Sequence, residues 1–156
     1  MICATLLAEL LDGPSTDAYM LNRGDVGLLR SLDRLSARDA SATAGGGASI
    51  AAHVDHLQYG LALMNRWSAG EHPFEAADWG RSWERTTVSE LEWRELRTGL
   101  EVEARRWLSA IEARRDASED EMRAIVGSIA HLAYHLGAIR QIHRGARGPA
   151  EPGRIR

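Results

Sequence analysis

The stretch SIAAHVDHLQYGLALMNRWSA, residues 49–69, decides the fold because its apolar residues recur at the spacing of a long helix. Ser49 is the predicted N-cap, and the helix is expected to run from Ile50 to about Ala69. At about 100° for each residue, both histidines share one wide apolar face, His53 near its middle and His56 closer to an edge. That face holds Ile50, His53, Val54, His56, Leu57, Gly60, Leu61, Leu63, Met64 and Trp67; opposite lie Asp55, Gln58, Asn65 and Arg66.

Capping boxes at Ser89–Glu92 and Ser118–Glu121 predict the starts of two more long helices. The expected inner face of the first is formed by Leu91, Leu96, Leu100, Ala104, Trp107, Leu108 and Ile111. The second is expected to reach about Arg144, with Met122, Ile125, Val126, Ile129, Leu132, Leu136 and Ile139 as its apolar residues. Towards the N-terminus, residues 2–11 predict a helix that stops at Asp12-Gly13-Pro14. Another helical stretch begins near Asp25 and ends before the flexible residues 41–49.

These elements predict an all-α protein, because alternating strand patterns are nearly absent. Three long helices and a split or shorter first one are typical of an up-down four-helix bundle. Residues 70–87 form a long loop between the second and third helices, and they could permit a crossover. We therefore expect a single domain over residues 1–145, followed by a loose, glycine- and proline-rich tail over residues 146–156.

Composition narrows the function classes. The net charge of −3 comes from mixed charges with no basic stripe, so nucleic acid is not an expected partner. No apolar run approaches the roughly 20 residues that span a bilayer, so no membrane association is expected. The single cysteine excludes an internal disulfide and fits a cytoplasmic protein. All 19 basic residues are arginine, which excludes a mechanism based on a Schiff-base or P-loop lysine.

Four of the six histidines lie in HVDH, residues 53–56, and HLAYH, residues 131–135. His131 and His135 lie one turn apart on one face of a helix, a spacing that can ligate one metal ion. The residues between them are Leu-Ala-Tyr, so the glutamate of the metalloprotease motif HExxH is missing. Two inward histidine clusters favour a shared cation, and the alternative is four separate imidazoles that are hydrogen-bonded locally. The periodicity admits either His53 or His56 as the ligand from the earlier helix.

Over residues 21–143 the chain resembles the DinB/YfiT-like superfamily of metalloenzymes. One part of the resemblance is H-x-x-x-H-x-G-x-I, present as His131-Leu-Ala-Tyr-His135-Leu-Gly137-Ala-Ile139. The other is a frame in which Ser-Ile precedes a His-Leu pair, matched by Ser49-Ile50 and His56-Leu57. The frame selects His56 as the ligand. A glutamine that often follows the motif's glycine is replaced here by Ala138.

The resemblance implies a four-helix bundle, frequent homodimers and a divalent metal, zinc or nickel, held by His56, His131 and His135. His53 is then an alternative ligand or lines the pocket. Characterised members resemble transferases and isomerases that depend on a low-molecular-weight thiol. The expected function is thus a metal-dependent enzyme in which the metal activates a thiol or water against a small-molecule substrate, with thiol-dependent S-transfer as the reaction that the resemblance implies. The alternatives are a metal-dependent hydrolase and a non-catalytic metal-binding or interaction module.

Several side chains near the predicted site have two interpretations. Each of Tyr59, Tyr134 and Arg140 is a candidate for contact with substrate, and each is also explained by a structural role. Trp79 and Trp83 in the long loop form either an aromatic lid or a pin that fastens the loop to the helices.

Overall fold

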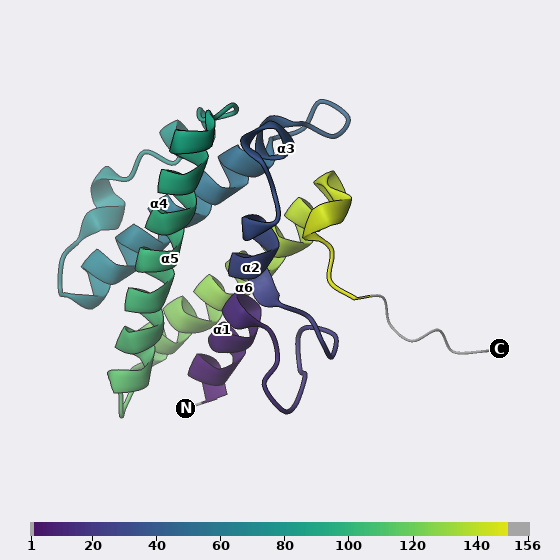
Figure 1. Cartoon of the computed structure of the whole chain (residues 1–156). Coiled ribbons are helices and arrows are strands. Elements are labelled where there is room, and N and C mark those ends of the chain that lie inside the picture. Colours follow the sequence, from purple (N-terminus) through teal and green to yellow (C-terminus); the bar gives the residue numbers. More distant parts are fainter. Residues whose placement is uncertain (1, 150–156) are drawn as a thin grey trace.

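The computed structural model describes residues 2–149, and all regular structure within them is helical (Figure 1). Six α-helices are present: α1 Ile2–Asp12, α2 Gly27–Asp33, α3 Ala37–Ser41, α4 Ile50–Ser68, α5 Glu90–Ala113 and α6 Glu119–Ile142. Three short 3-10 helices accompany them: η1 Pro73–Ala76, η2 Arg81–Trp83 and η3 Arg144–Ala146. The prediction of an all-α protein is confirmed.

The three long helices begin at the predicted serines. The hydroxyls of Ser49, Ser89 and Ser118 each accept a hydrogen bond from a backbone N–H in the first turn of the helix that follows. At Ser89 and Ser118 the reciprocal glutamate contact completes the capping box. These bonds satisfy N–H groups that have no partner within the helix, which explains why the starts are sharp.

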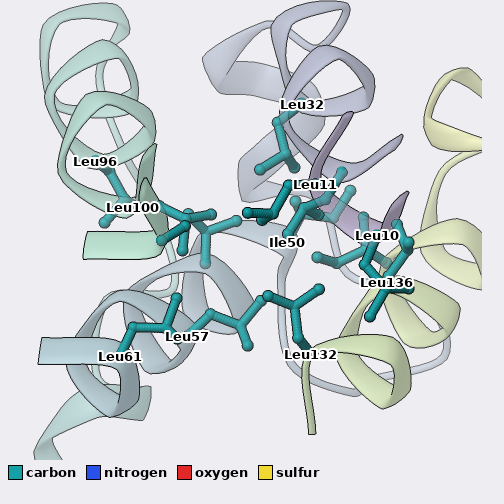
Figure 2. Close-up of a cluster of buried hydrophobic side chains, with 14 of the residues drawn as sticks. Leu10, Leu11, Leu32, Ile50, Leu57, Leu61, Leu96, Leu100, Leu132 and Leu136 are labelled. Carbon is teal, nitrogen blue, oxygen red and sulfur yellow. The ribbon is translucent and has the colours of Figure 1, made fainter. Parts of the chain in front are cut away.

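The core lies where α4 meets α5 and α6, and α1 packs against the same two helices. Figure 2 shows the leucines of these helices pointing towards one another, among them Leu57 and Leu61 of α4, Leu100 of α5 and Leu132 of α6. Each such side chain removed from water stabilises the fold by about 1.5–3 kcal/mol. Burial of this shared face holds α4 beside α6, and so brings HVDH next to HLAYH.

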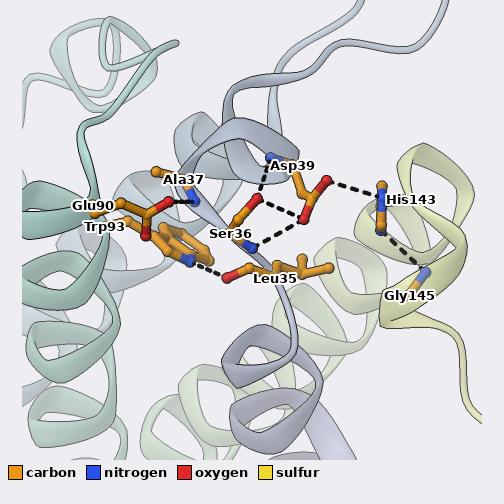
Figure 3. Close-up of polar contacts among 8 residues, drawn as sticks. All are labelled: Leu35, Ser36, Ala37, Asp39, Glu90, Trp93, His143 and Gly145. Atoms are coloured by element: carbon orange, nitrogen blue, oxygen red, sulfur yellow. Dashed lines mark hydrogen bonds and ion pairs between the residues drawn. The ribbon is translucent and has the colours of Figure 1, made fainter.

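The helical stretch expected from Asp25 to the glycine-rich segment is two helices, α2 and α3, separated by a break before Ala37. At the break Ser36 is extended, with ψ at 166°, and forms a capping box with Asp39. Leu35 O accepts a hydrogen bond of 2.8 Å from Trp93 Nε1, so the carbonyl freed by the break is satisfied from α5 (Figure 3). The prediction of one continuous helix is wrong because this serine begins a new one.

Two of the predicted helix faces also differ from those in the structure. Leu91, predicted to face inward, is 57% exposed, while Trp93 is buried. Residues two apart on a helix point about 200° away from each other, so the two cannot both face the core. Asn65, predicted on the outer face of α4, is buried because α5 packs there. Its Nδ2 donates hydrogen bonds to Glu103 O at 3.0 Å and to Glu103 Oε2 at 2.7 Å.

The tail over residues 146–156 was predicted to be loose, but Ala146, Arg147 and Pro149 contact the rest of the chain. Ala146 is fully buried, and Arg147 Nε donates a hydrogen bond of 3.0 Å to Arg140 O. Pro149 O accepts a hydrogen bond of 3.1 Å from Asn22 Nδ2. These contacts extend the packed region past Gly145, and residues 150–156 lie outside the described residues. Within the described part of the chain, no helix has both the length and the apolar character to cross a membrane.

Candidate metal centre

α4 and α6 bring three histidine Nε2 atoms together. His56 Nε2 lies 3.2 Å from His131 Nε2, which in turn lies 2.9 Å from His135 Nε2. The potential ligand atoms of the three residues all lie within 4.8 Å of one another. His56 and His135 are buried, and His131 is half-buried. The three side chains are therefore close enough to bind one metal ion.

The spacing of these nitrogens can be compared with a zinc site. Zn–N bonds are about 2.0–2.1 Å long, and tetrahedral geometry then places neighbouring nitrogens about 3.3 Å apart. The two observed Nε2–Nε2 distances, 3.2 and 2.9 Å, lie close to that value.

Ser82 fixes the orientation of His56. The hydroxyl of Ser82 donates its proton to Trp79 O at 2.7 Å, so it can only accept from His56 Nδ1, which lies 2.8 Å away. The neutral His56 ring therefore carries its proton on Nδ1, and the lone pair on Nε2 points at the other two histidines. Ser82 is buried in η2, so water does not compete for this bond.

His53 contacts the Nδ1 side of the His135 ring, which is opposite to the side that faces His131. Their Nδ1 atoms lie 2.8 Å apart, so one carries a proton and the other accepts it. His53 is buried and lies outside the group of three Nε2 atoms. When His135 donates from Nδ1, its Nε2 lone pair faces the cluster, the arrangement found in histidines that bind metals. The helix that supplies two histidines thus directs His56 into the cluster and places His53 behind His135.

Burial keeps these imidazoles neutral. Burial, followed by repulsion from His131 and His53, lowers the pKa of His56 to about 4. Burial, followed by repulsion from the other three histidines, lowers the pKa of His135 to about 3. Burial also lowers the pKa of His53 and of His131. At neutral pH the cluster presents nitrogen lone pairs, which is the form that binds a metal.

The long loop covers the cluster with aromatic rings. The Trp83 ring stacks on His56, with centroids 4.3 Å apart and planes 25° apart. Trp79 lies 5.5 Å from the same imidazole and is 40% exposed. Trp83 therefore packs against the histidines, while Trp79 lies at the surface beside them.

Tyr59, Tyr134 and Arg140 have different positions. Tyr59 Oη accepts a hydrogen bond of 2.9 Å from Asp78 N, which fastens the loop to α4. Tyr134 lies edge-on to His135 at 5.1 Å and is 70% exposed. Arg140 Nη2 donates to the buried Asp25 Oδ1 at 2.8 Å. Contact of these three side chains with a substrate stays a prediction, and the Arg140 guanidinium is engaged by Asp25.

A cavity of about 460 Å³ opens beside His56 and His131, between α4, α6 and the loop. The sequence did not point to two residues of this region, Ser82 and Gly127. Ser82 lies in a loop without periodicity, and a single glycine within a helix has no distinctive spacing. The only signal for Ser82 was its place next to Trp83 in a long loop rich in aromatic residues.

Comparison of the chain with protein-family models, with curated proteins and with solved structures finds no match.

Proposed function

We propose that this chain is a metal-dependent enzyme of the DinB-like type, in which His56, His131 and His135 hold one divalent metal ion, zinc or nickel. The proposal rests on the convergence of three Nε2 atoms, with 3.2 Å between those of His56 and His131 and 2.9 Å between those of His131 and His135. Imidazole nitrogens suit zinc and nickel, and three protein ligands leave positions open for another molecule.

The hydrogen-bond inventory supports a cation at this point. The Nε2 atom of His56 is an acceptor, because its Nδ1 proton goes to Ser82. The Nε2 atom of His135 is an acceptor as well whenever its Nδ1 donates to His53. A single N–H on His131 Nε2 would satisfy one of these buried acceptors well and leave the other without a full partner. A metal ion satisfies all three lone pairs at once.

The protein's own residues have distinct tasks in this proposal. A bound metal of this kind lowers the pKa of a coordinated water or thiol, so that hydroxide or thiolate is present near neutral pH. Ser82 and His53 hold the His56 and His135 rings in the tautomers that direct Nε2 inward. The Trp83 ring stacked on His56 excludes water from one side of the cluster.

The finer implications of the resemblance belong to the same proposal. The packing of both α1 and α4 on α5 and α6 supports an arrangement of the DinB-like four-helix type. A homodimer and a low-molecular-weight thiol as co-substrate follow from the resemblance alone. Analytical ultracentrifugation tests the first, and a melting screen against small thiols tests the second.

Elemental analysis of untagged protein is the primary test. We expect close to one zinc or nickel per chain in the wild type and a large loss in His135→Ala. His72→Ala is the matched control, because His72 is exposed and lies outside the cluster. Full metal content in His135→Ala, or equal loss in His72→Ala, would contradict the assignment.

A second measurement separates the enzyme from a non-catalytic binding module. Cobalt(II) substituted for the native metal reports its coordination through its visible spectrum. We expect that spectrum to change when a small thiol is added, because an open position accepts the sulfur. A spectrum that no thiol alters, together with unchanged melting temperatures, would favour a closed metal-binding module.

A further inference from the structure

The cavity beside the histidine cluster has a consistent chemical character. It holds about 460 Å³, within the usual range for small-molecule sites. The residues that line it come from α4, η1 and its flanking loop, and α6: His56, Leu57, Gly60, Leu61, Met64, Phe74, Trp79, Ala124, Gly127, Ser128, His131 and Leu132. Among the described residues, none with a charge belongs to this lining, so the walls are suited to an uncharged ligand.

The polar groups of the lining leave a ligand few hydrogen bonds. Ser128 Oγ accepts from Trp107 Nε1 at 2.9 Å and donates to Ile125 O at 2.7 Å. Its proton is thereby already used within the protein. The remaining side chains with polar atoms are His56 and His131, which belong to the proposed metal centre, and Trp79, whose indole Nε1–H can only donate. A charged or strongly polar ligand body would therefore lose most of its hydration here without replacement, which is costly.

Two glycines keep the cavity open. A Cβ added at Gly127 of α6 would meet no other atom within 4 Å, so the space in front of this residue is empty. A Cβ added at Gly60 of α4 would lie 3.6 Å from the Trp79 ring and 4.0 Å from His131 Cε1. Glycine weakens a helix interior relative to alanine. These positions therefore provide room at some expense of helix stability.

From this lining we propose that the pocket binds the uncharged, apolar part of a small molecule, an alkyl chain or an aryl ring. The polar head of the molecule then lies at the end of the pocket formed by His56 and His131. The proposal for the polar head depends on the metal centre proposed above, whereas the proposal for the apolar part depends only on the lining of the pocket. The exposed rings of Phe74 and Trp79 form the outer wall, and they determine which shapes fit.

The apolar part is tested with N-phenyl-1-naphthylamine, an uncharged dye whose fluorescence rises in apolar surroundings. We expect the wild-type chain to bind the dye and Gly127→Leu to bind it at least about tenfold more weakly, because the leucine fills the pocket. Gly137→Leu is the matched control: Gly137 is also exposed on α6, with no atom within 4 Å of an added Cβ, but it lies outside the lining. Equal dye binding by wild type and Gly127→Leu overturns the proposal, as does equal weakening in Gly137→Leu.

Gly127→Ala provides a second, milder variant, since alanine strengthens a helix and adds only a methyl group to the pocket. We expect its loss of dye affinity to lie between those of the wild type and Gly127→Leu. Circular dichroism checks that each variant is folded. An alanine variant that binds more weakly than the leucine variant would contradict the filling of an open space.

The head group is tested with alkyl hydroxamates of two to eight carbons and metal-loaded protein. We expect affinity to rise about fourfold for each added methylene until the pocket is full, and this dependence to weaken in Gly127→Leu. Affinity that does not change with chain length overturns the pocket assignment while leaving the metal centre intact. If the purified protein holds no metal, the proposed function is contradicted instead. Loss of dye binding in Gly127→Leu would still support the apolar pocket.

Discussion

The contact between His53 and His135 gives a sharp prediction for metal affinity. Binding through Nε2 requires the His135 proton to be on Nδ1, where His53 Nδ1 lies 2.8 Å away and accepts it. In His53→Leu this buried N–H has no partner in the metal-bound state. In the metal-free state the ring can move its proton to Nε2 instead. The penalty of about 1–3 kcal/mol for an unsatisfied buried donor therefore weakens binding, by roughly five- to 150-fold.

The assay is a competitive titration of zinc against a chromophoric chelator. We expect His53→Leu to bind about one zinc per chain, with lower affinity, because the three ligands remain. His53→Asn should recover most of the affinity, since its side-chain oxygen can accept the same proton. His56→Leu should lose stoichiometric binding. If His53→Leu loses the site and His56→Leu keeps it, then His53 is the ligand; if His53→Leu binds as tightly as the wild type, the bond does not orient His135.

Ser82→Ala should weaken metal binding about tenfold to 100-fold and Ser82→Thr much less, measured with the same chelator, because the hydroxyl orients His56. The metal-free protein should lose stability as the pH falls from 6.5 towards 4. Over this range His56 and His135 bind protons in the unfolded state, whereas their lowered pKa values keep them neutral in the folded state. Melting temperatures across pH would show this, with a flatter profile in His135→Asn. Arg140→Met should destabilise the fold by about 3–5 kcal/mol, because it leaves the buried Asp25 carboxylate without its arginine partner, and it should not change metal content. Unaltered unfolding by denaturant would exclude this structural role of Arg140.

The sequence predicted the features of this fold that depend on neighbouring residues. The starts of α4, α5 and α6 follow from serine caps, which act within one turn. The break between α2 and α3 had the same kind of signal, a serine three residues before Asp39. It was hidden because Val26, Leu29, Leu32 and Leu35 keep a three-residue spacing past the end of α2 at Asp33, up to the residue before Ser36. Periodicity alone could not show where that stretch divides.

Features that depend on contacts between distant segments were harder to predict. The position of Trp93 is fixed by its bond to Leu35 O, a partner that no helical pattern of α5 reveals. Within the site, periodicity placed both His53 and His56 on the inner face, and only the frame that begins at Ser49 favoured His56. Ser82 was missed because the path of residues 70–87 is set by Tyr59, Trp79 and the histidines rather than by local propensity.

The two walls of the pocket differ in what a change to them would cost. Leu57, Leu61 and Leu132 line the inner wall and also belong to the buried core, so truncating them would cost about 2–5 kcal/mol along with any effect on ligands. Phe74 and Trp79 line the outer wall and are 42% and 40% exposed, so much less stability depends on them. In the proposed pocket, ligand preference can therefore change through Phe74 and Trp79, while Ser82 and Trp83 of the same loop keep their contacts with His56. The specificity of the proposed pocket can thus vary at these two positions at a lower cost to the fold than at the three leucines.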